Sequence, residues 1–170
     1  MKQFHALHRI GRRSHVHGER GSTAVEFALV APVFFLLIFA ILEFGWYFFV
    51  EHTIHYATRE GTRLALVGTQ LNDPGGNPMS RVDSITSTIK DNAAMAVDPN
   101  SLLIKIYPVG ADYADPGNWE TIANNAGAGG DYMRVRTRYT YTFITPLIKQ
   151  FFTGGQRVIT ASTLFRNELF

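Results

Sequence analysis

The sequence predicts an α+β protein, in which a long N-terminal transmembrane helix continues into a small domain with a second helix and an antiparallel sheet. Three observations lead to this prediction. Residues 27–42 contain no charged side chain, residues 51–67 are amphipathic with a helical period, and residues 131–143 alternate between two kinds of side chain. The part of the chain after residue 50 is long enough for one modest core. Because the chain has no cysteine, we expect neither disulfides nor thiolate metal sites.

The chain begins with a basic leader, residues 1–21, whose net charge is +4. Basic residues beside a membrane span favour retention of that flank in the cytoplasm. We therefore expect the domain, residues 51–170, on the other side of a bacterial inner membrane. The leader also holds four histidines at irregular spacing: His5, His8, His15 and His17. We interpret it as a solvated tail that sets the topology, in preference to a metal site or a nucleic-acid site.

The transmembrane helix is predicted over residues 22–50. A helix over residues 24–50 is about 40 Å long, which exceeds the roughly 30 Å of a hydrocarbon core. Glu26 and Glu43 are 17 positions apart, or about 25 Å along a helix axis. Each carboxylate is thus expected near one face of the bilayer, where it reaches water or a partner. Trp46 and Tyr47 are expected to form an aromatic belt at the outer face.

Two details bear on the fate of this span. The residues that follow Leu42 are bulky and offer no site of the small-residue kind that signal peptidase cuts, so we expect the span to be retained. Pro32 removes one backbone hydrogen bond from the helix, and we interpret it as a passive kink.

The junction between leader and span has a distinctive order of residues. Gly21 is followed five positions later by Glu26 and then by Phe27. A carboxylate this close to hydrocarbon is costly unless it meets a cation or water. If the chain is cut after Gly21, the new ammonium group of Ser22 can neutralise Glu26 of a neighbouring subunit in an assembly of parallel helices. Alternatively, Glu26 lies at the cytoplasmic interface and reaches water by itself. The residues alone leave both interpretations open.

Beyond the span, residues 51–67 are expected to continue the same helix. Ala57, Gly61 and Ala65 are spaced by four and would form a narrow groove, suited to close packing by a sheet or another helix. Glu51, His52 and His55 lie nearby, but adjacent residues point about 100° apart on a helix, so we interpret them as ordinary surface and not as a metal site.

The run RGSTAVEFALVAPVFFLLIFAILEFGWYFF and the segment ATREGTRLA resemble the start of TadE-like pseudopilins of the tight-adherence (Flp) pilus system, which are related to type IV pilins. The resemblance covers residues 20–66 and returns faintly at residues 161–168. It implies a pilin-like fold and cleavage by a prepilin peptidase between Gly21 and Ser22. Glu26 and Phe27 would then be the fifth and sixth mature residues, with roles in recognition and assembly. The remaining family-motif positions are Glu43, Gly45, Arg59, Glu60, Gly61 and Arg63.

The domain is predicted to contain a helix at residues 80–97 and strands near 102–107, 131–143 and 156–165. The loop at residues 110–130 offers oxygen ligands at Asp112, Asp115, Asn118 and Glu120. Their spacing is not that of an EF-hand, so we interpret the loop as mobile or as a contact surface.

Three arginines, Arg134, Arg136 and Arg138, share one face of the strand at residues 131–143. We interpret this face as the solvated outer side of the sheet, in preference to a site for an acidic partner, a phosphate or a nucleic acid.

The sequence shows no catalytic constellation, so we expect no enzymatic activity, no cofactor and no metal. The leading hypothesis is a minor pilin or pseudopilin that is processed by a prepilin peptidase and takes part in assembly of a tight-adherence (Flp, type IVb-like) pilus. Its expected partners are the peptidase, other pilins or pseudopilins, the inner-membrane assembly platform and the membrane, without nucleic acid. It would be a single-pass inner-membrane protein with a cytoplasmic N-terminus and a periplasmic domain, or lie in the pilus at the cell surface. The alternative is an uncleaved, single-span anchor whose outer domain binds a ligand or an adhesion target.

Overall fold

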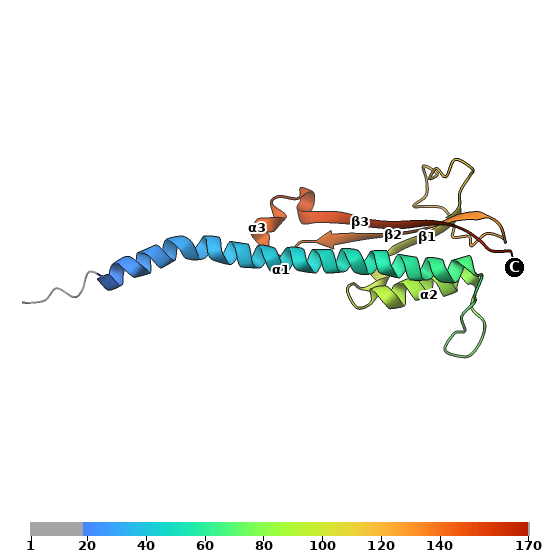
Figure 1. Ribbon diagram of the computed structural model, residues 1–170, viewed down its shortest axis with the longest axis horizontal. Helices are drawn as coiled ribbons and strands as arrows, with labels where there is room; N and C mark the ends of the chain where they lie inside the picture. Colours follow the sequence, from blue (N-terminus) through green and yellow to red (C-terminus); the bar gives the residue numbers. More distant parts are fainter. Residues whose placement is uncertain (1–18, 170) are drawn as a thin grey trace, which may run out of the picture. The chain divides into compact units, whose positions relative to one another are not determined.

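The computed structural model describes residues 19–169 and has the predicted α+β architecture. The helices are α1 (Glu19–Leu66), α2 (Arg81–Ala93) and the short α3 (Pro146–Lys149), with 3-10 turns at Pro99–Ser101 and Thr153–Gly155. The strands β1 (Leu103–Pro108), β2 (Tyr132–Thr142) and β3 (Gln156–Arg166) form one antiparallel sheet in the order β1-β2-β3 (Figure 1). A long apolar N-terminal helix, a second helix and an antiparallel sheet confirm the predicted fold class.

The chain divides into two compact units, the first ending at Phe39 and the second running Ala40–Phe170. In the first unit, the described residues all belong to α1, and the helix continues through Pro32. The predictions about the leader histidines concern residues outside the described part of the chain.

Apolar side chains of the first unit are exposed: Phe27, Leu29 and Leu37 are 67%, 73% and 58% accessible. Between Gly21 and Leu66, α1 is long and apolar enough to cross a membrane, and no side chain of its most apolar stretch is buried. Exposed apolar surface on this scale calls for cover by lipid or protein. These features fit a membrane-anchored protein.

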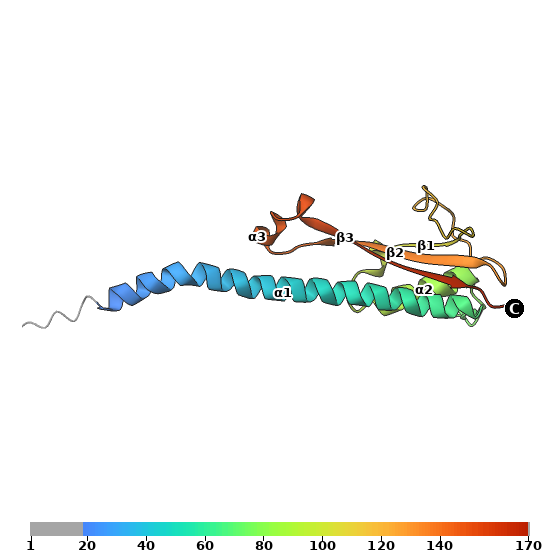
Figure 2. The same ribbon diagram turned by 45° about the horizontal axis from the view of Figure 1, so that its top comes forward.

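In the second unit, one face of α1 is buried over residues 43–65. Tyr47, Val50, Ile54 and Ala57 recur at the three- or four-residue spacing of a helix face and belong to the core. Burial at this spacing is what an amphipathic helix achieves by lying on a sheet, and both views show the sheet along this part of α1 (Figure 2).

The residues of the expected groove on α1 are buried, and α2 packs against the groove at Gly61. Ala57, Gly61 and Ala65 are all buried. A Cβ atom added to Gly61 would lie 2.4 Å from Cγ1 of Ile89, on α2. The small side chains therefore let the two helices approach more closely than larger ones would.

The sheet has one face toward the core and one covered by a loop. Met133, Val135 and Thr137 on β2 are buried, and Thr58 of α1 donates a hydrogen bond to the Thr137 hydroxyl over 2.9 Å. Intervening residues of β2 face the other way, toward the loop between β1 and β2, which lies on the side of the sheet away from α1 (Figures 1 and 2). The predicted alternation is thus present in β2.

Local capping residues account for the helix ends. Gly68, with φ of 68°, donates its N–H to the carbonyl of Ala65, which ends α1 close to the expected residue 67. The Ser80 hydroxyl accepts a hydrogen bond from the Asp83 N–H at the start of α2. The second helix ends at Ala93, earlier than the expected residue 97, because the following residues form a turn that leads to Pro99.

Candidate functional site

The residues of the expected cleavage and assembly site lie together on the first turns of α1. Gly21, Ser22, Glu26 and Phe27 are all exposed. The hydroxyl of Ser22 donates a hydrogen bond to Oε1 of Glu26 over 3.2 Å. Residues four apart are neighbours on a helix, so this contact follows from their spacing. The carboxylate of Glu26 is therefore open to solvent or to another chain.

Nothing in the described fold requires a glycine at position 21. A Cβ atom added to Gly21 would meet no atom within 4 Å among the residues that the structure describes. Glycine costs about 1 kcal/mol relative to alanine inside a helix. Among the described residues, neither packing nor helical backbone conformation explains this cost.

Glu43 has an environment that the sequence did not reveal. It is 6% exposed, although it follows directly on the charge-free run of α1. Its carboxylate accepts hydrogen bonds from the backbone N–H groups of Ile144 and Thr145, both at 2.7 Å. It accepts two more, from the Thr145 hydroxyl at 2.6 Å and from the Tyr141 hydroxyl at 3.2 Å. The partner of Glu43 is therefore its own chain, at the corner where β2 ends.

The phenol of Tyr141 shares in this arrangement. Burial of its ring, followed by the negative charge of Glu43, raises the pKa of Tyr141 to about 12. The phenol thus stays protonated at neutral pH and remains a hydrogen-bond donor to the carboxylate.

Of the two residues expected to form an aromatic belt, one is exposed and the other is buried. Trp46 is 46% exposed, as expected, but Tyr47 is 7% exposed and packs against Tyr141 and Phe143 in the core. The expectation that Tyr47 lies at a membrane face is therefore wrong. Because Glu43, Tyr47 and Val50 are buried, one face of residues 43–50 is closed to lipid.

The family-motif residues of the second unit serve different contacts. Gly61 lies against α2, whereas Arg59 and Arg63 are exposed. Arg63 forms an ion pair with Glu60 over 3.0 Å on the helix surface. Gly45 is exposed, and a Cβ atom there would meet nothing within 4 Å in the described structure. Only Glu43 and Gly61 are thus explained by packing within the described chain.

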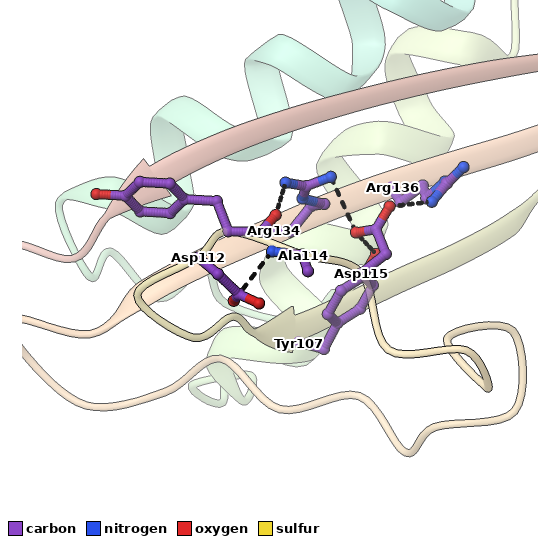
Figure 3. A network of polar contacts seen from close by, with 7 residues as sticks. Tyr107, Asp112, Ala114, Asp115, Arg134 and Arg136 are labelled. Atoms are coloured by element: carbon purple, nitrogen blue, oxygen red, sulfur yellow. Dashed lines mark hydrogen bonds and ion pairs between the residues drawn. The ribbon is translucent and has the colours of Figure 1, made fainter.

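The arginines of β2 are covered rather than solvated, which corrects the expectation of an open outer face. Asp115 of the loop pairs with Arg134 at 2.9 Å and with Arg136 at 2.5 Å, and accepts a hydrogen bond from the Tyr107 hydroxyl (Figure 3). The side chains of Arg134, Arg136 and Arg138 are only 17%, 22% and 32% exposed.

Neighbouring loop residues complete this cover. The guanidinium of Arg136 stacks on the ring of Trp119, 4.1 Å from its centre, and Arg138 pairs with Glu120. Asp112 accepts a hydrogen bond from the N–H of Ala114. The acidic side chains of the loop are thereby engaged within the domain. The negative charges of Asp115 and Glu120 thus offset the positive charges of the three arginines.

Within residues 19–169, no group of three or more His, Asp or Glu side chains is placed to hold a metal ion. Glu51, His52, His55 and Arg59 line a shallow depression on the surface of α1. We assign no chemistry to it.

Two further residues were not singled out from the sequence. Arg81 donates hydrogen bonds to the carbonyls of Ala65 and Gly127 and to the side chain of Asn167. Asn167 is 2% exposed and donates to the carbonyls of Ala126 and Ala128. They join the end of α1, the start of α2, the loop before β2 and the chain after β3. No spacing signal in the sequence could have paired them.

Comparison with known proteins finds a family match along most of α1. Residues 21–63 match the family model described as TadE-like protein. Neither the curated proteins nor the solved structures contain a match to the chain. The matched segment begins at Gly21 and ends at Arg63, so it includes the exposed glycine, both glutamates and the ATREGTR part of the motif. This confirms the resemblance seen in the sequence: the chain carries a TadE-like segment along α1.

Proposed function

We propose that this protein is a minor pilin or pseudopilin that is cut by a prepilin peptidase between Gly21 and Ser22 and then takes part in assembly of a tight-adherence pilus. The TadE-like family implies involvement in tight-adherence pilus assembly, and the anchor-like helix fits a membrane protein. The finer steps of processing and subunit pairing are the proposal. The observation that carries it is the start of the family match at an exposed glycine that the fold does not need.

The chemistry of the proposal concerns the carboxylate of Glu26. Within residues 19–169, this carboxylate accepts a hydrogen bond from the hydroxyl of Ser22. Cleavage would create an ammonium group on Ser22, one turn away on the same helix or on a neighbouring subunit. An opposite charge offsets the cost of placing a carboxylate at the edge of hydrocarbon. The other expected partners are the assembly platform and further pilins at the membrane.

We infer a structural role rather than an enzymatic one, without a cofactor. The basic leader supports a cytoplasmic N-terminus and a periplasmic domain in the inner membrane of a bacterium. The binding-module alternative relies on the arginines of β2 and the acids of the loop. These groups pair with each other, which leaves little charge free for an outside ligand.

The test is the intact mass of protein extracted from membranes of cells with an active prepilin peptidase. The expected mass is that of a chain beginning at Ser22. A matched sample from cells without the peptidase should give the full-length mass. If residues 1–21 remain attached in both, processing is excluded and the uncleaved-anchor alternative gains support.

A further inference from the structure

An apolar corner, residues 144–152, joins β2 to β3 in the second unit and contains α3. Its inner side belongs to the core: Ile148 is 4% exposed, and the ring of Phe152 stacks on Phe143 at 4.0 Å. Its outer side is also apolar, but Ile144, Leu147 and Phe151 are 73%, 43% and 79% exposed. Because Ile148 and Phe152 already anchor the corner, no simple rotation would bury the outer side chains within the domain.

The charged residues of the corner and its two flanking strands are all basic, whereas Glu43 and Glu51 of α1 lie beside the corner. From Tyr132 to Asn167 the sequence holds no aspartate or glutamate. Within the corner, the charged residue is Lys149, and Arg157 follows at the start of β3. Both side chains belong to exposed residues. Apolar side chains beside lysine and arginine are typical of segments that lie on an anionic membrane surface.

Glu43 fixes the place of the corner along α1. Its carboxylate binds the N–H groups of Ile144 and Thr145, the first two residues of the corner. Residue 43 directly follows the charge-free run 27–42, so the corner is attached within the last third of the predicted span 22–50. Both ribbon views place α3 at the end of the sheet opposite the C-terminus (Figures 1 and 2). The described loop 109–131 lies toward the other end.

Helix α1 and the corner share a groove that is lined mainly by aromatic side chains. A groove of about 350 Å³ lies beside the corner, and its lining includes Phe44, Phe48 and Glu51 of α1, Phe152 of the corner and Arg157 of β3. Phe44 and Phe48 are 37% and 52% exposed, and Trp46 is 46% exposed. Aromatic side chains gather at this level, as they do at the interface between hydrocarbon and headgroups.

We propose that the apolar corner is a second membrane contact, in which Ile144, Leu147 and Phe151 enter the leaflet beside the domain and Lys149 and Arg157 bind lipid phosphates. The occupant is the lipid surface, because the corner is bonded to the helix where the charge-free run ends and presents exposed apolar side chains beside the exposed residues Lys149 and Arg157. This contact would hold the domain at the bilayer until the subunit leaves it. The proposal rests on the membrane anchoring of α1 but not on processing at Gly21.

The absence of cysteine makes the test direct, since a single engineered cysteine can carry a spin label. The full-length chain would be placed, one copy per disc, in lipid nanodiscs containing phosphatidylethanolamine and phosphatidylglycerol. The test positions are L147C and F151C. V67C is the matched control, because Val67, the residue that follows α1, is 46% exposed and Leu147 is 43% exposed. L37C reports on the apolar run itself.

Accessibility of each label to oxygen, which concentrates in lipid, is compared with accessibility to a water-soluble nickel chelate. We expect the ratio of oxygen accessibility to chelate accessibility to be several-fold higher for labels at 147 and 151 than for the label at 67. The label at 37 should show a similarly high ratio. Equal accessibility at 147, 151 and 67 would overturn the proposal. Protection of 147 and 151 from both reagents only when several copies share a disc would overturn it in favour of a protein partner.

Two further measurements separate the causes of failure. A water-accessible label at 37 would mean that α1 is not anchored, which would overturn the membrane contact together with the anchoring on which the proposed function depends. With 37 in lipid and 147 in water, only the corner contact is lost. In the F151C chain, K149E should lower the oxygen preference, and the effect should be larger in discs with phosphatidylglycerol. If K149E leaves the oxygen preference unchanged in discs both with and without phosphatidylglycerol, the proposed phosphate contact is overturned.

Discussion

Glu26 and Glu43 border the same charge-free run of α1, yet their surroundings differ. Glu26 is exposed and has a hydrogen bond from Ser22 four residues away. Glu43 is buried and accepts hydrogen bonds from three residues about a hundred positions further along the chain. The comparison teaches that two carboxylates at the ends of one apolar run serve different purposes. Glu43 holds the corner after β2 on the helix, whereas Glu26 stays exposed on the helix surface.

The largest expected effect is on Glu43. Replacing Glu43 by alanine removes the acceptor for two backbone N–H groups, the Thr145 hydroxyl and the Tyr141 hydroxyl. Hydrogen bonds to a charged group contribute about 1.5–3 kcal/mol each, with poor additivity, so we expect a loss of about 3 kcal/mol or more in the free energy of unfolding. Thermal unfolding in detergent, followed by near-ultraviolet circular dichroism, would measure it. Glu43→Gln keeps one acceptor oxygen and should therefore lower the free energy of unfolding by less than Glu43→Ala does.

Glu26→Ala is the matched control for this experiment. It should change the free energy of unfolding by less than about 0.5 kcal/mol, as is usual for exposed sites. Under the proposed function it should still insert in the membrane but lower the yield of pili, whereas Ser22→Ala, which keeps the carboxylate, should not. Normal pilus yield with Glu26→Ala would remove the proposed pairing. Equal stability of Glu43→Ala and Glu26→Ala would contradict the contrast between the two residues.

A second contrast concerns the glycines of the same segment. A methyl group at Gly61 would meet Ile89 of α2 at 2.4 and 2.8 Å and the carbonyl of Ile85 at 3.2 Å, whereas at Gly45 it would meet nothing within 4 Å in the described structure. We expect Gly61→Ala to lower the free energy of unfolding by about 1–3 kcal/mol through overpacking. Gly45→Ala should raise it by up to about 1 kcal/mol through helix propensity. Urea unfolding in detergent would measure both.

The clash at Gly61 also predicts a specific rescue. Ile89→Ala removes the side-chain atoms that the new methyl group would touch. The double variant Gly61→Ala with Ile89→Ala should therefore be less destabilised than the sum of the two single variants. Strict additivity, or a stable Gly61→Ala chain, would show that α2 does not pack on α1 at this point.

The elements of this fold were readable from the sequence because each has a local period. Side chains of a strand alternate with period two, which located β2 and separated its buried residues from its arginines. The spacing of Ala57, Gly61 and Ala65 likewise predicted the groove on α1. The TadE-like resemblance added the residues proposed for cleavage and assembly, which no periodicity indicates.

The contact partners of Glu43 and of the β2 arginines could not be predicted from the sequence. Contacts between residues far apart in the chain leave no local pattern. The local sequence around a glutamate beside an apolar run is the same whether its carboxylate contacts water, lipid headgroups or the backbone N–H of a residue 101 positions away. The arginines of β2 were placed on one face, but what covers that face is an irregular loop. For the same reason, the contacts of Arg81 and Asn167 became visible only in three dimensions.

The smallest expected effect on stability at neutral pH comes from the titration of Tyr141. This titration also reports directly on the surroundings of Glu43. Burial and the charge of Glu43 raise the pKa of Tyr141 to about 12, above the usual value near 10. A raised pKa means that the folded state favours the neutral phenol. Its contribution to stability is therefore complete below about pH 10 and is lost as the pH rises toward 12. In that range the loss is at most about 1.4 kcal/mol per unit of pH.

The comparison is with Tyr141→Phe, which lacks this titration but keeps the ring. The difference in stability between the two chains should narrow from pH 10 to pH 12, since the remaining tyrosines, lysines and arginines titrate in both. Urea midpoints at pH 9, 10, 11 and 12 would measure it, with tyrosinate absorbance at 295 nm as a direct readout. Glu43→Gln should lower the pKa of Tyr141, but not fully to 10, because burial is the larger cause. Glu26→Gln should leave that pKa unchanged, and a shift in that variant would mean that the two carboxylates do not act separately.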